Sequence, residues 1–556
     1  MRSLAELDVL IVDCQATGAS PAFGHVLELG WGVQRAGEAA ISGARAHWIA
    51  LPEGHQVPRP VQKITGYDAC FAAEAMADRE AWRELRQDAG GAPSIPTAVH
   101  YARFELSFLR EWAERFAPEE PFPFDAVCVH AIARRLYPDL PRQSIRALAG
   151  YLGYSLDLAR RSLGHVEATG FVWNRLRTEL ATRGVTTWEE LPAFLAERPS
   201  RRPAAQAGKK PRYPIAPERY RTLPDQPGVY RFLRSNGDVL YVGKAASLKK
   251  RVSSHFGSRA GTPLAPEMLT QVGDIAVTVV ESALEAALLE NETIKTLRPP
   301  YNTQLTVKEV PVWYASRSFE RALTARDEEH PLGPIPSELS LRPLAALIAL
   351  LSGEPATARL RSRAVGVSAL FTPDESVFAA GWEQILERHP ELASSARTPR
   401  RRVLDLARKL LVAAPAAEPE SEAAETRSWD PERVARHVER ALVQAYRSYR
   451  RAHFLALIHD CDVVYREPSA TFARVLQVRD GALVASRAVP PDYVPAERVR
   501  PKLTCRAVFD RAKYERLRVL TTELKRILRD GGHVSLHWSP RRQLPSRWLA
   551  GALAAA

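Results

Sequence analysis

Cysteine is scarce in this chain, and the cysteines present lie far apart. Five occur among 556 residues: Cys14, Cys70, Cys128, Cys461 and Cys505. No two of them form a CxxC pair, so the sequence offers neither a zinc ribbon nor a disulfide framework. This usage is typical of a reducing compartment, and we expect a cytoplasmic location.

Long apolar segments are also missing. The first residues, MRSLAELDVL, lack the apolar core of a signal peptide, and no uninterrupted apolar run is long enough to cross a bilayer. The run LAALIALLSG, which begins at Leu344, is short and predicts a buried helix. We therefore expect no membrane partner.

Acidic residues are outnumbered by basic ones. The chain has 77 Lys and Arg against 64 Asp and Glu, which gives a formal net charge of +13. An excess of this size favours a polyanionic partner, most often nucleic acid, although arginine-rich codon usage is an alternative explanation. Hydrophobic residues make up 46% of the chain, as in ordinary globular proteins.

Two aperiodic stretches divide the chain, one rich in Pro, Lys and Arg and one acidic. A chain of this length is too long for one core, so we expect about three domains. The expected parts are an α/β domain over 1–196, a basic linker over 197–216, a small α/β domain over 217–305, a helical region over 306–412, an acidic linker over 413–428, and a C-terminal region of unknown role over 429–556.

The first part alternates strand and helix patterns. The stretches DVLIVD, VLELGWGVQ and ARAHWIAL predict strands. The stretches EAWRELRQD, FELSFLREWAERF, SIRALAGYLG and HVEATGFVWNRLRTEL predict helices. Helices packed on strands in this way indicate a layered α/β fold.

The middle part contains PGVYRFLRSNGDVLYVGKAASLKKRVSSHF, residues 227–256. Its Asn-Gly pair predicts a two-residue hairpin turn. In that register Tyr230 pairs with Gly243 and Phe232 pairs with Tyr241. Both tyrosines then lie on one face of the hairpin, and the glycine leaves open space beside Tyr230.

A helix follows the hairpin. Ser247 is the expected N-cap, and Leu248 and Val252 have the i,i+4 spacing of a buried side. Arg251 and His255 have the same spacing on another side, so we expect these two side chains to project together.

A second helix is predicted in SALEAALLENETIKTLRPPYN, residues 282–302, and should end at Pro299. Glu290 lies beside its apolar stripe, where an unpaired carboxylate would be costly to bury. A divalent metal ion would be a suitable partner. Taken singly, the tyrosines are better explained as packing aromatics, and Glu290 is better explained as a solvated helix charge.

Together these residue types suit the hydrolysis of a phosphodiester. A carboxylate can hold a hard ion such as Mg²⁺, with Mn²⁺ as the alternative, and the ion polarises the phosphate. A guanidinium offsets charge on the phosphoryl oxygens, and a tyrosine near it can activate water.

The motifs GVY, from Gly228, and YVG, from Tyr241, resemble the two halves of the GIY-YIG nuclease signature. The resemblance extends over about residues 224–303 and is to the nuclease domain of the excinuclease C family and its single-domain relative Cho. It implies that Tyr230 is the general base, Tyr241 supports the nucleophile or phosphate, Lys244 and Arg251 contact phosphate, Glu290 binds the metal and Asn302 orders the site.

We therefore expect Tyr230, Tyr241, Arg251 and His255 to be catalytic, and Lys244, Lys249, Lys250 and Asn302 to serve DNA binding. One position departs from the pattern. The bacterial repair enzymes usually carry Tyr where this chain has His255, although other GIY-YIG nucleases use His there.

The N-terminal stretch IVDCQATG, residues 11–18, resembles the first motif, DxExTG, of the DnaQ-like exonucleases, which share the fold of the epsilon chain of DNA polymerase III. Further motifs follow in the family's order over about residues 7–176, namely VLELG with Glu28, ITGY at Ile64 and AVHYARFELSFL at Ala98. The resemblance implies an RNase H-like α/β fold.

The metal-binding residues of such an exonuclease are mostly lost. Asp13 is kept, Glu105 replaces an Asp, and Gln15 is neutral. Arg160 takes the place of the family's His, and His165 takes that of its last Asp. Two divalent ions would meet too little negative charge at this degenerate site, so we expect it to be inactive.

Two alternatives about metal ligands remain open. Glu167 or Asp157 could replace a lost exonuclease ligand, although the strict geometry of Mg²⁺ disfavours this. His459, Asp460 and Asp462 in HDCDVVY are a second conceivable metal site, for which a strand with charged ends is the better interpretation.

The expected fold class is α/β, with an RNase H-like exonuclease fold, a small GIY-YIG domain and a mainly helical C-terminal region. The expected function is Mg²⁺-dependent nicking of DNA in an excision-repair-like role, with the first domain used for docking. The alternatives are an active 3′→5′ exonuclease and a non-catalytic DNA-binding scaffold. DNA is the expected partner, with DNA-repair or replication proteins as further candidates.

Overall fold

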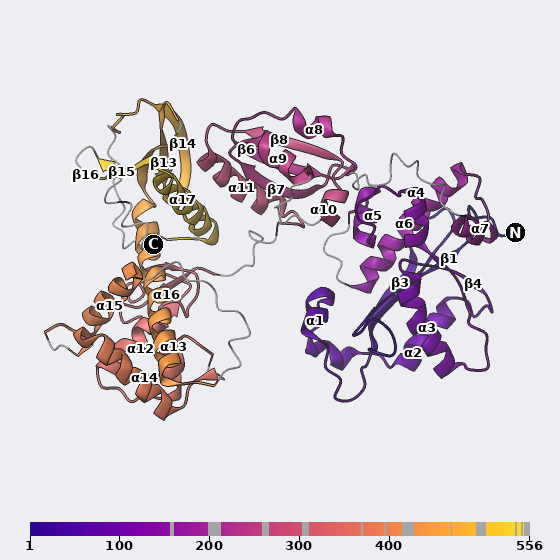
Figure 1. Cartoon of the computed structure of the whole chain (residues 1–556), viewed down its shortest axis with the longest axis horizontal. Coiled ribbons are helices and arrows are strands. Elements are labelled where there is room, and N and C mark those ends of the chain that lie inside the picture. Colours follow the sequence, from indigo (N-terminus) through magenta and orange to yellow (C-terminus); the bar gives the residue numbers. More distant parts are fainter. Residues whose placement is uncertain are drawn as a thin grey trace. The chain divides into compact units, whose positions relative to one another are not determined.

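The computed structural model of the chain (Figure 1) describes the following residues: 1–155, 161–197, 213–257, 266–302, 311–368, 371–393, 396–413, 428–468, 470–495, 508–539, 542–545 and 549. Contacts divide the chain into two compact units, Met1–Ala286 with Thr293–Thr306 and Ala287–Glu292 with Val307–Ala556. Both predicted linkers lie mostly outside the described residues, and the predicted domain boundaries stay predictions.

The first unit begins with a five-stranded sheet in the order β3-β2-β1-β4-β5. β1 pairs antiparallel with β2 and parallel with β4. The strands are β1 (Val9–Ala16), β2 (Val26–Gln34), β3 (Ser42–Trp48), β4 (Ile95–Val99) and β5 (Phe124–Cys128). The first three match the predicted strands. β4 and β5 were not predicted, because runs of this length carry little periodicity.

Helices cover both faces of this sheet. They are α1 (Arg59–Thr65), η1 (Ala69–Glu74), α2 (Asp78–Asp88), α3 (Ala102–Phe116), α4 (Val129–Leu136), α5 (Ile145–Tyr151), α6 (Ser162–Thr182), η2 (Trp188–Glu190) and α7 (Leu191–Ala196). Val9 and Ile11 of β1 join the core under α6, whereas Leu10 and Val12 join the core under α2 and α3. Because successive strand residues point to opposite faces, β1 contributes side chains to the cores on both sides of the sheet. A sheet covered by helices in this way confirms the predicted α/β class.

A three-stranded antiparallel sheet in the order β7-β6-β8 follows in the same unit. The elements of this part of the chain are α8 (Pro217–Arg221), β6 (Gly228–Leu233), β7 (Val239–Ala245), α9 (Leu248–Phe256), α10 (Pro266–Thr270), β8 (Asp274–Val279) and α11 (Ala283–Leu297). The predicted hairpin is β6–β7, and the two predicted helices are α9 and α11.

Both predicted pairs of the hairpin, Tyr230 with Gly243 and Phe232 with Tyr241, are present. The predicted two-residue turn is wrong. The loop is longer and holds Gly237 at a φ of 93°, and a β-bulge beyond Phe232 shifts the register. The bulge adds one residue to one strand and so offsets the longer loop.

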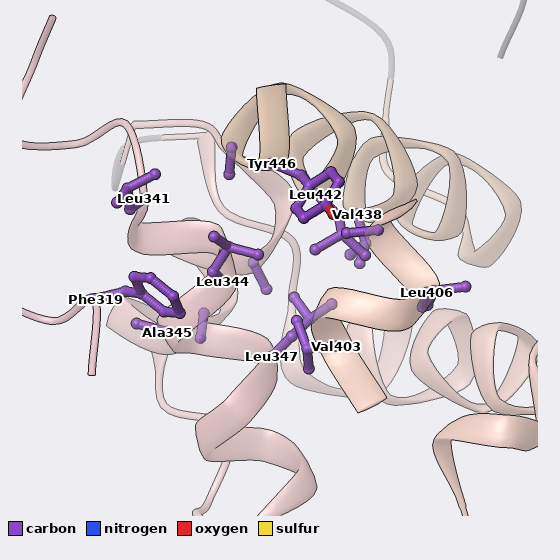
Figure 2. Packing of buried hydrophobic residues seen from close by; sticks show 14 of the residues in the cluster. Phe319, Leu341, Leu344, Ala345, Leu347, Val403, Leu406, Val438, Leu442 and Tyr446 are labelled. Atoms are coloured by element: carbon purple, nitrogen blue, oxygen red, sulfur yellow. The ribbon is translucent and has the colours of Figure 1, made fainter. Parts of the chain in front are cut away.

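The second unit starts with a small sheet and a group of helices. The elements are β9 (Trp313–Ala315), β10 (Ala322–Leu323), β11 (Leu332–Ile335), α12 (Arg342–Leu351), α13 (Ala358–Val365), α14 (Glu375–Arg388), η5 (Pro390–Leu392), α15 (Pro399–Ala413) and α16 (Pro431–Ile458). Figure 2 shows Leu344 and Leu347 of α12, Val403 of α15 and Leu442 of α16 in one core. The helix predicted at Leu344 is thus confirmed.

A second five-stranded sheet completes this unit, in the order β14-β13-β12-β15-β16, with all neighbours antiparallel. Its elements are β12 (Cys461–Arg466), β13 (Ala473–Arg479), β14 (Ala482–Val489), α17 (Arg511–Arg529), β15 (His533–Ser539) and β16 (Arg542–Leu544). The C-terminal region is mainly helical as predicted, but only β12 of this sheet was foreseen. Among the described helices, none is both long and apolar enough to span a membrane.

Candidate active site

Two tyrosines of the β6–β7 hairpin share one face of the sheet. The ring centroids of Tyr230 and Tyr241 lie 6.1 Å apart. Gly243 makes room for them, because a Cβ at this position would lie 2.5 Å from the hydroxyl oxygen of Tyr230 and 2.8 Å from the ring of Tyr241. Only glycine allows so close an approach of the ring to the strand backbone.

The hydroxyl of Tyr230 is hydrogen-bonded to His255, with 2.7 Å between Oη and Nε2. Each of the two residues is only 1% exposed. Burial, and to a lesser extent the charge of Arg251, lowers the pKa of His255 to about 4. The imidazole is therefore uncharged at neutral pH and can exchange a proton with the tyrosine.

The prediction that Arg251 and His255 project together is wrong. Both lie on α9, but Arg251 is exposed, whereas the ring of His255 turns inward. It packs edge-on against Phe232, with 5.6 Å between the ring centroids. The uncharged imidazole behaves here as one more aromatic ring of the domain core.

α9 begins as predicted. The Ser247 hydroxyl accepts the backbone N–H of Lys250 at 3.2 Å and caps the helix. Leu248 and Val252 are fully buried beneath it. The exposed basic side chains near this end of the helix are Lys244, Lys249, Lys250 and Arg251.

Asn302 holds β7 in place. Its Oδ1 accepts the backbone N–H of Val242 and its Nδ2 donates to the carbonyl of the same residue, both at 2.8 Å. The side chain is buried. Val242 separates Tyr241 from Gly243, so these bonds fix the strand at the site. They support the ordering role for Asn302 and argue against the predicted DNA contact.

Glu290 lies in α11 and is half-buried. The helix starts at Ser282, whose side chain caps the N–H of Glu285 at 3.1 Å, and it ends just before Pro299 as predicted. The predicted apolar stripe is buried and consists of Leu284, Ala287, Leu288 and Ile294. Glu290 is the one carboxylate among the predicted GIY-YIG residues. A single hard oxygen ligand suits Mg²⁺, which keeps several of its waters.

The degenerate exonuclease-like site gathers three predicted residues near the carboxyl ends of β1 and β4. Asp13 is buried, and its Oδ2 lies 3.4 Å from Nδ1 of His165. Glu105, in the first turn of α3, is buried nearby. Burial raises the pKa of Glu105 well above its ordinary value, and the charge of Asp13 adds to this effect.

An ion pair that was not predicted, between a buried carboxylate and an exposed arginine, borders this site. Glu28 is fully buried in β2, forms an ion pair with Arg161 and accepts the N–H of Ser162 at 2.8 Å. The Arg161 guanidinium also lies 4.2 Å from the centre of the Trp48 ring. The prediction placed a cation at Arg160, which lies outside the described residues. The need of any buried strand carboxylate for a partner could have pointed to the pair at Glu28.

The alternative exonuclease ligands gain no support. Glu167 is exposed on α6, and Asp157 lies outside the described residues. Gln15 lies opposite Glu28 in the sheet and contributes no charge. Among the residues that the structure describes, no group of three or more His, Cys, Asp or Glu side chains is arranged to hold a metal ion.

The conceivable metal site at His459 also gains no support. Asp462 forms an ion pair with Arg479 at 2.7 Å, and Nδ1 of His459 lies 3.0 Å from Asp460. A cation from the protein already balances Asp462. The stretch HDCDVVY is therefore better interpreted as a strand, β12, with paired charges at its ends than as a metal site.

Comparison with known proteins identifies residues 226–303 as a UvrC-like GIY-YIG domain. The matched range includes Tyr230, Tyr241, His255 and Glu290. The chain is also 54% identical over 81 residues to the UvrABC system protein C of Nitrosomonas europaea, which covers 15% of this chain and 13% of the relative.

A second relative covers more of the chain. It is a candidate bifunctional exonuclease/endonuclease of Mycobacterium tuberculosis, 28% identical over 364 residues, with 63% of this chain and 53% of the relative covered. The chain thus spans about half the length of this relative. This chain thus joins a UvrC-like GIY-YIG domain to an exonuclease-like α/β fold, as the two motif resemblances predict.

Solved structures give weaker matches. One is the GIY-YIG endonuclease domain of UvrC from Thermotoga maritima bound to magnesium, with 31% identity, 16% of this chain and 93% of that chain covered, and a TM-score of 0.14. Another is E. coli exonuclease I in complex with an oligonucleotide, with 14% identity, 32% and 42% coverage and a TM-score of 0.27. Scores this low do not describe a common arrangement of whole chains.

Proposed function

We propose that this protein is a metal-dependent endonuclease that nicks DNA with its GIY-YIG site. The observation that carries the proposal is the buried hydrogen bond between Tyr230 and His255, which lies inside the range that matches the UvrC-like domain. A tyrosine paired with an uncharged imidazole is a proton-transfer unit, and hydrolysis of a phosphodiester needs one to activate water.

The proton moves through two side chains in this proposal. As water attacks the phosphorus atom, its proton passes to the hydroxyl oxygen of Tyr230, and the tyrosine's own proton passes to Nε2 of His255. The low pKa of His255 keeps that nitrogen free to accept at neutral pH. Arg251 and Lys244 are exposed next to this unit and bind the phosphate oxygens.

The donor set fits a hard divalent ion. Glu290 would hold Mg²⁺, which when bound stabilises charge on the leaving oxygen. The resemblance to the excinuclease C family supports an excision-repair-like role in this proposal. The exonuclease-like domain docks DNA in this proposal and thereby raises the local concentration of substrate at the nuclease site.

The first test replaces Glu290. In a nicking assay on supercoiled plasmid with Mg²⁺, Glu290→Gln should lose activity, because the amide carries no charge to hold the ion. Its affinity for DNA, measured without metal, should stay within a few-fold of wild type, since phosphate contacts from the basic side chains do not need the ion.

Glu292→Gln is the matched control, because this exposed residue of the same helix is not a predicted ligand. Nicking by Glu290→Gln at the rate of the control would refute the site. The same assay separates the alternatives. An exonuclease would act only from DNA ends and leave the closed circle intact, and a scaffold would bind without cutting.

A further inference from the structure

One side of α16 is lined with arginines. They recur at intervals of three, four or seven residues, which a helix with 3.6 residues per turn brings to the same side. The members of this α16 stripe are Arg433, Arg436, Arg440, Arg447 and Arg451. From first to last they extend over about 27 Å, because an α-helix rises about 1.5 Å per residue. Val434, Val438 and Leu442 lie on the other side, in the core.

α17 contacts α16 and adds a further cation to the stripe. Lys525 of α17 is half-buried. Its pKa is lowered first by burial and then by the positive charges of Arg451 and Arg447. Three cations thus converge where the two helices meet, and they repel one another.

Other cations of this unit have acidic partners, among them Arg436 of the stripe, which forms an ion pair with Glu432 at 3.6 Å. Arg479 is paired with Asp462 at 2.7 Å, and Lys513 is paired with Asp480 at 2.8 Å. Within the described part of the chain, neither Arg447 nor Lys525 takes part in an ion pair. The two half-buried like charges of Arg447 and Lys525 are costly to hold close together, and an anion bound from outside would relieve the repulsion between them.

We infer that the α16 stripe and Lys525 form a binding surface for the phosphate backbone of duplex DNA. Arginine suits phosphate because its planar fork can bind two oxygens at once. A straight row of about 27 Å matches about eight base pairs, at about 3.4 Å for each. Contacts of this kind position a protein on DNA without reading its sequence.

This inference rests on the proposed function only in taking DNA as the substrate. It gives the second unit, which lacks the GIY-YIG residues Tyr230 and Tyr241, a role in binding. The surface would hold duplex DNA through α16 and α17, which carry none of the predicted GIY-YIG residues, so affinity and cutting can be varied separately.

The test uses the full chain and the double variant Arg447→Ala/Lys525→Ala. Binding is followed by fluorescence anisotropy on a duplex of about 30 base pairs, in EDTA, at about 0.05 to 0.2 M salt. We expect affinity at the higher salt to fall about 10-fold, and the slope of log K against log salt to decrease by about 2, since each phosphate contact contributes about 0.9.

The control variant Arg317→Ala/Arg408→Ala removes the same charge from two exposed positions of the same unit. Affinity and slope within twofold of this control would overturn the inference, as would a loss confined to a single-stranded oligonucleotide. The melting temperature of the double variant should equal or exceed that of wild type, because repulsion is removed. A lower melting temperature would mean that the two side chains serve folding and would also overturn it.

Because EDTA prevents cutting, this result does not depend on the nuclease site. Loss of binding by the double variant in a protein that never nicks would refute the proposed function and leave the DNA surface standing. Conversely, if the wild-type protein nicks DNA but the double variant binds DNA as well as wild type, the DNA surface would be refuted and the proposed function would stand.

Discussion

At the scale of single residues, His255 differs most from its predicted behaviour. An ordinary imidazole titrates near pH 6.5, and the i,i+4 spacing predicted that His255 projects beside Arg251. Burial instead lowers its pKa to about 4. The folded-state pKa lies below the unfolded one, so the stability that neutral His255 contributes is complete above about pH 6.5 and is lost as pH falls toward about 4.

His255→Ala should lower kcat by about 100-fold, the usual scale for a proton-transfer group. His255→Phe keeps an aromatic ring against Phe232 but removes the hydrogen bond to Tyr230, so it should lose as much. Single-turnover nicking rates check this, and a His255→Phe enzyme as fast as wild type would show that His255 only packs.

The residue scale also shows what sequence reasoning cannot reach. The spacing of Arg251 and His255 predicts that they are neighbours on a helix, but not which of them turns toward the core. The pair of Glu28 and Arg161 joins residues far apart in the chain, and no local pattern connects them. Residue types were predictable at both places, whereas partners depend on the tertiary fold.

At the scale of elements, the β6–β7 hairpin was predicted correctly for a partly wrong reason. The pairs Tyr230 with Gly243 and Phe232 with Tyr241 are as expected, although the turn is longer than expected. The alternation of buried residues determines the register, because a slip by one residue would move every side chain to the opposite face. The bulge absorbs the difference that the longer loop makes.

Gly243→Ala should disturb the site through this strand. Its Cβ would press on the ring of Tyr230, and overpacking of this kind costs about 1–3 kcal/mol. Gly237→Ala is the matched control: its φ of 93° makes alanine costly by about 1–2 kcal/mol, but no atom lies within 4 Å of the new Cβ. Both variants should melt earlier, and only Gly243→Ala should nick much more slowly. Equal nicking rates would contradict the tight fit around Tyr230.

Helices and strands with a clear hydrophobic periodicity were predicted from the sequence, whereas short strands were not. The strands β1 to β3 and the helices α2, α3, α5 and α6 all lie where alternation or a 3.6-residue period placed them. β4, β5 and most of the C-terminal sheet are short or have mixed faces. Their assignment depends on pairing with strands distant in sequence, which a single sequence does not reveal.

At the scale of the whole molecule, the two candidate sites differ in their electrostatics. The GIY-YIG residues combine one carboxylate with exposed cations, which suits a phosphate and a single metal ion. The exonuclease-like site keeps carboxylates, but basic side chains of the protein already face two of them, since Arg161 forms an ion pair with Glu28 and the imidazole of His165 lies beside Asp13. The sequence motifs predicted the GIY-YIG residue set and the loss of negative charge at the exonuclease-like site. They did not predict the ion pair between Glu28 and Arg161.

The exonuclease-like site should therefore not cut DNA. The pKa of buried Glu105 is raised, so this carboxyl resists ionisation, and Asp13 has a histidine where a further carboxylate would be needed for two metal ions. The full chain with Glu290→Gln, which silences the other site, should leave a 3′-labelled single strand intact in Mg²⁺ or Mn²⁺. Adding Asp13→Ala should change nothing. Stepwise loss of nucleotides that disappears with Asp13→Ala would show instead that the chain is a double nuclease, with Asp13 as a working metal ligand.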